Sequence, residues 1–251
     1  MSGHNKWSTI KRKKGAADAK RGQLFTRITR EIVIAAREGG GDADANMRLR
    51  IAVDKAKGQN MPKENIERAI KRGSGDDKEG VNYEEIYYEG YGPHGIALMM
   101  ECVTENRNRT VAEIRHTLSR SGGGMGEAGS VAWQFKKAAV FEISADSVDF
   151  DRVFELAVDG GADDVTEDGD TFYITAPIES FKILNTKLNE AKIIIEDAGL
   201  RMLPNQEIEL SVGDTLQVLK TIEALEDMDD IQNVFHNLKV SDEAMAALEE
   251  D

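Results

Sequence analysis

The chain has 251 residues, which is enough for one large domain or two to three small ones, and its 40% hydrophobic content predicts a globular protein with a real core. No run of about 18 apolar residues is present, which excludes a transmembrane helix, and the polar N-terminus lacks the apolar segment of a signal peptide. Cys102 is the single cysteine, so no intrachain disulfide can form, and we expect a reducing cytoplasm as the location.

Charge is distributed very unevenly along the chain. Residues 1–75 contain 18 Lys and Arg against 8 Asp and Glu, a balance of +10. Residues 76–251 contain 14 against 38, a balance of −24, and together these give the overall −14. A basic cluster binds phosphate backbones partly by releasing condensed counterions, while an acidic body stays clear of them. This pattern is typical of a nucleic-acid-binding protein and unusual for a metabolic enzyme.

The basic region begins with an arm and a helix. The first 20 residues are polar and basic with little periodicity, so we expect an arm that is loosely ordered without a partner. Residues 21–38 predict an amphipathic helix, and the three glycines that follow end it by supplying positive φ. The apolar arc of this helix consists of Leu24, Phe25, Ile28, Ile32 and Ala35.

Two shorter helices follow and complete a small bundle. The pattern over 46–57 predicts a helix with Asn46 as its N-cap. Pro62 suits the first turn of a third helix, which we expect Gly73 to end. The glycine-rich, charged stretch 73–80 then predicts a linker.

After the linker, strand patterns alternate with helix patterns. The first of these helices is expected to open at Thr110, because Thr110 and Glu113 have capping-box spacing. The acidic turn 167–170 predicts a β-hairpin. The expected strands cover 96–103, 131–135, 140–143, 164–166, 171–175, part of 193–203, 207–212 and 231–235, with an extra edge strand near Tyr87, and the expected helices cover 111–119, 150–158, 178–191 and 214–225.

This order of elements predicts an α+β fold with internal symmetry. Residues 138–204 give β-α-β-β-α-β, the ferredoxin-like arrangement, and the flanking segments 81–137 and 205–251 give it again when joined. We therefore predict an N-terminal three-helix domain over 1–75 and two ferredoxin-like α/β domains, the second inserted into the first. Two sequential α+β domains divided near residue 137 are the simpler alternative.

No catalytic constellation is found in the sequence. The glycines at 124–129 fit G-x-G-x-x-G, but they follow a helix and precede a strand, the reverse of a dinucleotide-binding turn. We expect a flexible connection over 122–129 instead, the alternative being a loop that lets a nucleic-acid backbone approach. The four histidines are scattered, and Cys102 lies in an apolar strand. The protein is therefore expected to be non-enzymatic, with no cofactor, no metal and no small-molecule substrate.

Candidate nucleic-acid-binding residues concentrate in the basic region. Trp7 beside the basic run could stack on an unpaired base, although packing into the core is an equal alternative. The lysines could neutralise phosphates without reading sequence, or serve solubility alone. The candidates in this region are Lys6, Trp7, Lys11, Arg12, Lys13, Lys14, Lys20, Arg21, Arg27, Arg30, Lys63, Arg68, Lys71 and Arg72.

Two further segments add candidates outside the basic region. Arg107 and Arg109 precede an expected helix N-terminus, where guanidinium groups and free backbone N–H groups would make an anion seat. The alternative is that both arginines pair with nearby carboxylates. The aromatic, glycine-rich turn 87–94 could offer a stacking platform, although aromatic packing at a sheet edge is more common.

Several motifs resemble one known family over nearly the whole chain. They are Gly3-His4-Asn5-Lys6-Trp7, Lys20-Arg21-Gly22, Gly39-Gly40-Gly41-Asp42, Asn60-Met61-Pro62-Lys63, the run from Ile66 to Gly73, Tyr88-Glu89-Gly90-Tyr91-Gly92-Pro93, Asn106-Arg107-Asn108-Arg109-Thr110, Gly129-Ser130-Val131-Ala132-Trp133 and the run from Gln232 to Asn237. The sequence resembles the YebC/PmpR family, which includes the mitochondrial translational activator of cytochrome oxidase. Asn5 stands where the family usually has Ser.

The resemblance implies three domains and a cytoplasmic, non-enzymatic factor. Bacterial members are commonly described as DNA-binding transcriptional regulators, whereas other members associate with ribosomes and help the synthesis of difficult nascent sequences. The expected partner is therefore DNA or ribosomal RNA, with the ribosome as a further candidate partner, and not a membrane. From the residues themselves, the loop near 39–45 is longer than the turn of a helix-turn-helix, which weakens sequence-specific DNA readout and leaves both functions open.

Overall fold

The structure is a computed structural model, and it describes residue 7 and residues 18–75 and 83–250. The chain divides into two compact units. The smaller unit is Lys136–Leu203, and the larger unit combines Ser2–Phe135 with Pro204–Asp251. Each unit is described by itself.

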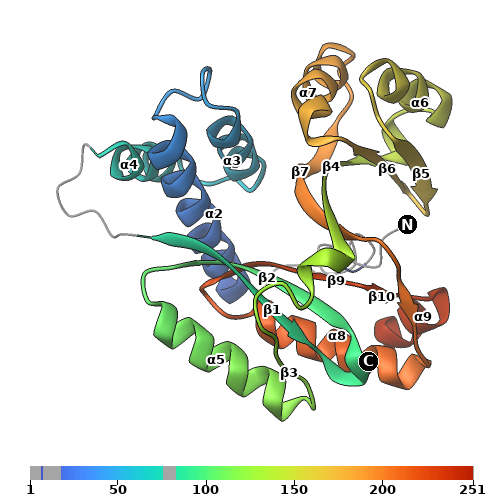
Figure 1. Cartoon of the computed structure of the whole chain (residues 1–251). Helices are drawn as coiled ribbons and strands as arrows, with labels where there is room; N and C mark the ends of the chain where they lie inside the picture. Colours follow the sequence, from blue (N-terminus) through green and yellow to red (C-terminus); the bar gives the residue numbers. More distant parts are fainter. Residues whose placement is uncertain (1–6, 8–17, 76–82, 251) are drawn as a thin grey trace. The chain divides into compact units, whose positions relative to one another are not determined.

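Between residues 18 and 75 the larger unit contains three helices, as the sequence predicts (Figure 1). They are α2 (Asp18–Gly39), α3 (Met47–Gly58) and α4 (Lys63–Ser74). Their core includes Ile28, Ile32, Leu49 and Ile66, all at least 94% shielded from solvent. Asn46 caps α3 as expected, because its side chain accepts a hydrogen bond from the Leu49 N–H (3.1 Å). It also donates to the carbonyl of Ala35 (2.7 Å), which ties the start of α3 to α2.

Gly73 does not end α4, contrary to the prediction. The helix continues to Ser74, and Gly75, at φ +87°, takes the left-handed position that ends it. Gly73 is buried against α2 instead, where an added Cβ would lie 2.7 Å from Cβ of Ala36 and still closer to the carbonyl oxygen of Val33. Its missing side chain therefore serves close helix packing rather than helix termination.

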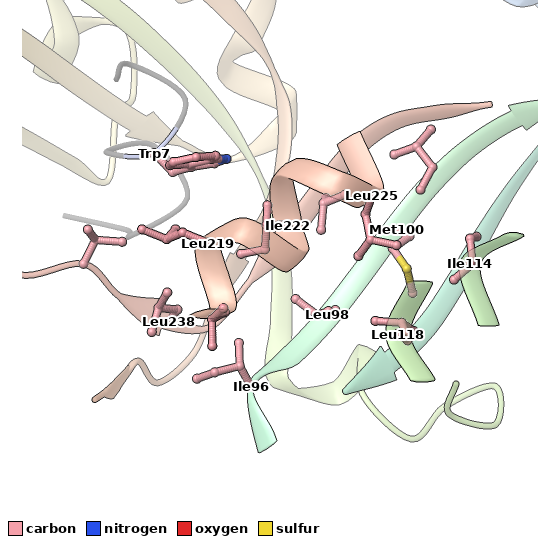
Figure 2. Close-up of a cluster of buried hydrophobic side chains, with 14 of the residues drawn as sticks. Trp7, Ile96, Leu98, Met100, Ile114, Leu118, Leu219, Ile222, Leu225 and Leu238 are labelled. Carbon is pink, nitrogen blue, oxygen red and sulfur yellow. The ribbon is translucent and has the colours of Figure 1, made fainter. Parts of the chain in front are cut away.

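The larger unit also contains a four-stranded antiparallel sheet of order β3-β1-β2-β9. Its strands are β1 (Glu84–Tyr91), β2 (Ala97–Thr104), β3 (Gly124–Met125) and β9 (Ile231–His236). Two helices cover one face, namely α5 (Arg107–Arg120) and α8 (Val212–Glu226) (Figure 1). Figure 2 shows the core between sheet and helices, where Leu98 and Met100 of β2 meet Leu118 of α5 and Ile222 of α8.

Two short strands and a last helix complete the larger unit. Strands β8 (Ile208–Glu209) and β10 (Leu238–Lys239) form a separate parallel pair. Helix α9 (Asp242–Glu250) is not among the predicted elements. Its sequence signal is Ser241, whose hydroxyl accepts a hydrogen bond from the Ala244 N–H (3.2 Å) in the manner of an N-cap.

The ferredoxin-like order predicted for the larger unit is wrong in three strands. The strand near Tyr87 is β1, which lies inside the sheet between β2 and β3 rather than at an edge. Of the strand expected over 207–212, only β8 forms, and it is not part of this four-stranded sheet. In place of the strand expected over 131–135, Ala132–Gln134 form a 3-10 turn. The carboxylate of Glu89 accepts hydrogen bonds from the backbone N–H groups of Val131 and Ala132, so these groups are not available to a neighbouring strand.

The smaller unit has the element order predicted for it, β-α-β-β-α-β. Its elements are β4 (Phe135–Ser144), α6 (Phe150–Asp159), β5 (Asp164–Asp168), β6 (Thr171–Ala176), α7 (Phe181–Glu190) and β7 (Ile195–Pro204). The strand order is β5-β6-β4-β7, with antiparallel pairing of β6 to both β4 and β5. The stacked rings of Phe141 and Phe181, 4.8 Å apart, join the sheet to α7.

No helix among the described residues is long and apolar enough to cross a membrane.

Candidate nucleic-acid interface

Helix α4 exposes basic side chains that are candidates from the sequence. Lys63, Arg68 and Lys71 are exposed, and Arg72 is half-buried, while Ile66 and Ala69 turn inward. The Lys63 Nζ atom lies 3.6 Å from the carboxylate oxygen Oε1 of Glu67, which is four residues further along the helix. Such an exposed pair contributes little to stability, so Lys63 remains available to a phosphate group. Helix α4 thus carries basic residues that the sequence predicts as nucleic-acid contacts and that the structure shows to be exposed.

Trp7 is buried, which favours the packing alternative over base stacking. Its exposed fraction is 4%, and it belongs to the core between the sheet and α8. Figure 2 shows it at the edge of this cluster, and its indole N–H donates to the carboxylate of Glu226 on α8 (3.2 Å). An indole whose N–H is bonded and whose faces are covered has no surface left for a base.

The arm residues lie outside the part of the chain that the structure describes. They are Lys6, Lys11, Arg12, Lys13 and Lys14, and their predicted role stays a prediction. Lys20 and Arg21 fall in the first turn of α2.

Arg27 and Arg30 of α2 turn toward the sheet rather than toward solvent. Burial lowers the pKa of the half-buried Arg27, although the nearby carboxylates of Glu226, Asp227 and Asp229 act in the opposite direction. Arg30 is 8% exposed. Its guanidinium donates to the carbonyl of Val103 (3.2 Å) and to the carbonyl of Asp229, so it is positioned as a structural group.

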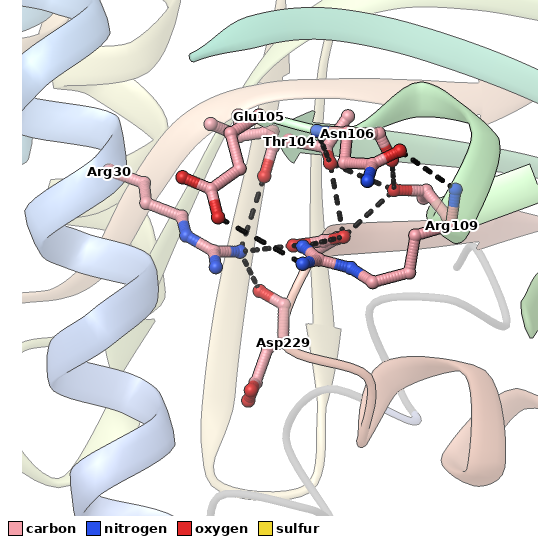
Figure 3. Close-up of polar contacts among 9 residues, drawn as sticks. Arg30, Thr104, Glu105, Asn106, Arg109 and Asp229 are labelled. Atoms are coloured by element: carbon pink, nitrogen blue, oxygen red, sulfur yellow. Dashed lines mark hydrogen bonds and ion pairs between the residues drawn. The ribbon is translucent and has the colours of Figure 1, made fainter. Parts of the chain in front are cut away.

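The buried carboxylate of Asp230 is the centre of an ion cluster with Arg30 and Arg109. Figure 3 shows the guanidinium groups of these two arginines pointing toward one another. Arg30 from α2 donates to the Asp230 carboxylate at 3.0 Å, and Arg109 from α5 donates to both of its oxygens at 3.1 and 2.9 Å. Thr104 and Thr110 donate to the second oxygen at 3.1 and 2.8 Å. One carboxylate therefore joins the helical region, the sheet and α5.

The cluster keeps Asp230 ionised. Burial by itself raises the pKa of a carboxyl group, but the hydrogen bonds from Arg109 and Thr110 and the charge of Arg30 outweigh it. The pKa of Asp230 is therefore below its usual value. Arg109 is committed to this carboxylate, and this geometry favours the pairing alternative over an anion seat.

Helix α5 starts earlier than predicted, and the hydroxyl of Thr110 binds Asp230 instead of capping the helix. Helix α5 begins at Arg107 with Asn106 as its N-cap, whose side chain accepts from the Arg109 N–H (3.1 Å). Thr110 therefore lies inside the helix and its hydroxyl serves Asp230, so the predicted capping box is wrong. Arg107 pairs with the carboxylate of Glu84 on β1. Asn106, an Asx-type cap residue directly before the helix, is the signal that the reasoning from the sequence missed.

Trp133 is a functional candidate that reasoning from the sequence missed. Its side chain is 71% exposed, and its indole N–H donates to the carbonyl of Ser130 (3.0 Å). The hydroxyl of Tyr91, itself 36% exposed, donates to the same oxygen (3.0 Å). The sequence pattern predicts a strand at this tryptophan, which directs attention to packing rather than to exposure.

The glycine-rich segment before Trp133 is packed rather than a free connection. Gly124 and Met125 pair with β1 as strand β3, and the Gly126 N–H donates to the carbonyl of Glu89 (2.8 Å). The Glu89 carboxylate accepts from the backbone N–H groups of Gly129 (2.7 Å), Val131 (2.6 Å) and Ala132 (2.8 Å). Part of the connection expected over 122–129 is therefore a strand, and the hydrogen bonds to β1 and Glu89 hold Gly126 and Gly129.

Glu89 occupies an anion-binding nest made by its own chain. Burial by itself would raise its pKa, but the backbone hydrogen bonds from Gly129, Val131 and Ala132 lower it below the usual value. A dinucleotide phosphate is thus not needed to satisfy these donors. Among the residues that the structure describes, no group of three or more His, Cys, Asp or Glu is placed to hold a metal ion.

These features define a class of α+β protein with a basic three-helix region and two antiparallel sheets. Residues 5–76 match the model of the TACO1/YebC protein N-terminal domain, and residues 83–238 match that of the TACO1/YebC second and third domain. The chain belongs to the TACO1/YebC family.

Relatives match the chain from end to end. A protein of Geobacter sulfurreducens named "probable transcriptional regulatory protein" is 51% identical over 248 residues, 99% of this chain and 100% of the relative. A protein of Chlorobaculum parvum with the same name is 48% identical over 252 residues, covering 100% of both. The crystal structure of a conserved hypothetical protein of Aquifex aeolicus matches with a TM-score of 0.84 at 38% identity, over 90% of this chain and 93% of that one.

Proposed function

We propose that the chain is a non-enzymatic nucleic-acid-binding regulator of gene expression that acts on DNA in the cytoplasm. The observation that carries this proposal is the concentration of positive charge in residues 1–75, against a balance of −24 in the remainder. Family membership and the names of the relatives support regulation of transcription as the process. A protein with this charge distribution would bind the phosphates of a polyanion mainly through its basic region.

Helix α4 supports a contact surface within that region. Lys63 occupies its first position, where the helix dipole disfavours a positive charge by about 0.3–1 kcal/mol. Its side chain is 88% exposed and gains little from the carboxylate of Glu67. A cation that costs stability and is almost fully exposed is better accounted for by an external anion such as a phosphate.

The connection between α3 and α4 also favours duplex DNA. Only residues 59–62 separate the two helices, within the range of a helix-turn-helix, and Asn60 takes the left-handed conformation that such a tight turn needs. The longer loop near 39–45 precedes α3 and is not part of this turn. In a helix-turn-helix the second helix enters the major groove, and α4 carries Lys63, Arg68 and Lys71 as exposed cations.

A salt-dependence measurement tests this surface. In the triple variant Lys63→Gln, Arg68→Gln, Lys71→Gln, we expect weaker DNA binding and a smaller slope of log K against log salt. Each lost phosphate contact lowers the slope by about 0.9 for duplex DNA, so three contacts lower it by about 2.7. Lys182→Gln with Lys220→Gln removes exposed cations outside the basic region and should leave the slope unchanged.

The slopes of the two variants decide the outcome. An unchanged slope in the α4 variant would move the contact surface away from α4, toward the arm at Lys11–Lys14. Losses in proportion to the number of charges removed, three in the α4 variant and two in the control, would indicate a general charge effect without a defined surface. Failure of the wild-type protein to bind any nucleic acid at low salt would refute the proposed function.

A second candidate function is a translation factor that binds ribosomal RNA and helps the synthesis of difficult nascent sequences. The observation that favours it is the exposed Trp133, because unstacked bases are common in RNA loops and scarce in duplex DNA. Crosslinking in growing cells separates the two functions. Recovery of discrete promoter DNA supports the transcriptional role, and dominant recovery of ribosomal RNA contradicts it.

A further inference from the structure

We propose that Trp133 and Tyr91 form a stacking site for unpaired bases of a single-stranded nucleic acid. The two rings, named here the Ser130 aromatic pair, share one hydrogen-bond acceptor. The Trp133 N–H and the Tyr91 hydroxyl each donate to the Ser130 carbonyl at 3.0 Å, which brings their polar edges together. The proposal rests on the nucleic-acid binding of the proposed function, and it adds a site on the protein for unpaired bases.

The backbone that carries this pair is held by many bonds. Glu89 binds three N–H groups between residues 129 and 132, and Asn205 donates to the Trp133 carbonyl (3.0 Å). The Asn205 N–H also donates to the Gln134 carbonyl (2.7 Å). The backbone under this exposed side chain is therefore ordered before a ligand binds, which lowers the entropy cost of binding.

The exposed surface of Trp133 is suited to a flat ligand. Its indole N–H is already bonded within the protein, so what remains for a ligand is the apolar ring face. Trp133 is the most exposed of the large apolar side chains that the structure describes, at 71%. Base stacking needs one aromatic face and a fixed orientation, and both are present here.

The surroundings favour a base over an apolar protein partner. The apolar neighbours of Trp133 in the chain, Val131 and Phe135, are buried, and those that are not buried are small or polar, namely Gly129, Ser130, Ala132 and Gln134. Protein partners bind through extended patches with several buried apolar groups, which these neighbours do not supply. The stacking role considered for Trp7 in the sequence is therefore reassigned to Trp133.

Binding assays with the full chain test the site. The probes are a labelled pyrimidine oligonucleotide of about 16 nucleotides and a hairpin duplex with the same number of phosphates. Trp133→Leu should bind the single strand between roughly 5-fold and 150-fold more weakly and the duplex within about twofold of the wild type. Trp133→Phe keeps an aromatic face and should recover most of the affinity. Ile194→Ala alters another exposed apolar residue and should change neither affinity.

Intrinsic fluorescence gives an independent readout, because the chain has only two tryptophans and Trp7 is buried. Acrylamide should quench wild-type emission through Trp133, and saturating single strand should protect it. The Trp133→Leu variant should show little quenching with or without the oligonucleotide. Because Trp133 is exposed, the substitution should leave the far-ultraviolet circular dichroism unchanged.

The outcomes separate this proposal from the proposed function. Equal single-strand affinity of wild type and Trp133→Leu, with emission unprotected, overturns the stacking site and leaves nucleic-acid binding intact. A Trp133-dependent interaction with a protein instead of the oligonucleotide also overturns it. Absence of binding to either probe at low salt refutes the proposed function, and the stacking site with it.

Discussion

At the scale of single residues, two arginines that the sequence predicts as phosphate ligands are paired with one carboxylate of the fold, although only Arg30 is buried and Arg109 stays exposed. Arg30 and Arg109 both bind Asp230, whose side chain is 2% exposed. A charge placed in such surroundings is stable only while its partners remain, because desolvation is compensated by the ion pair and the hydrogen bonds together. The positive charge of residues 1–75 is therefore not all available to a nucleic acid.

We expect Asp230→Asn to lower the free energy of unfolding by about 3–5 kcal/mol, since it leaves Arg30 buried without its counter-charge. Chemical denaturation of the two proteins measures the difference. Glu84→Gln is the matched control, because its pair with Arg107 is exposed and should contribute at most about 1 kcal/mol. Similar losses in both variants would contradict a special role for the buried cluster.

The same residue predicts a pH dependence. The pKa of Asp230 is lower in the folded protein than the ordinary aspartate value of about 3.9, so the folded state gains stability above that value. This contribution is lost as the pH falls through the folded pKa. The unfolding free energy of Asp230→Asn should therefore vary less between about pH 5 and pH 2 than that of the wild type. Parallel pH profiles would count against the ionised cluster.

At the scale of elements, close backbone approach decides where helices pack and end. Helix α4 crosses α2 at Gly73, and the predicted role of this glycine is wrong because a glycine near a helix end usually marks a C-terminus. Only the position of the neighbouring helix distinguishes the two roles. The segment 131–135 is a similar case: its pattern predicts a strand, whereas Glu89 binds the backbone N–H groups of Val131 and Ala132 and a 3-10 turn forms.

Gly73→Ala should destabilise the helical region by about 1–3 kcal/mol, because the added methyl group would overlap Val33 and Ala36 of α2. Gly58→Ala is the control, since among the described residues no other part of the chain would lie within 4 Å of its added methyl group, and alanine favours a helix. The control should be neutral or slightly stabilising. Denaturation midpoints compare the two, and a neutral Gly73→Ala would show that α4 can shift away from α2 at no cost.

At the scale of the whole molecule, the smaller unit 136–203 has its own sheet and core. It interrupts a larger unit whose sheet combines β1 and β2 with β9 from the far side of the insertion. The chain must therefore complete the insertion before the larger sheet can close, which makes its contacts long-range. The division of the chain into three domains remains our proposal.

Leu184→Ala should destabilise the smaller unit by about 2–5 kcal/mol, because this fully buried side chain of α7 packs against Gly160 at the end of α6. Ile183→Ala, at the exposed neighbouring position, should change stability by no more than about 0.5 kcal/mol. Hydrogen exchange should quicken in 136–203 and stay unchanged elsewhere in Leu184→Ala. Uniformly faster exchange would mean that the two units unfold together.

The sequence by itself determined most of the local elements and the division of charge, because periodicity and caps such as Asn46 depend on neighbouring residues. It also determined the element order of the smaller unit, whose strands and helices follow one another without interruption. Tertiary structure alone decided that Arg30 is buried and that Arg109 pairs with Asp230, since both arginines are distant from this carboxylate in the chain. It likewise decided that Trp7 is buried and Trp133 exposed, because burial depends on what packs against a side chain and not on its identity.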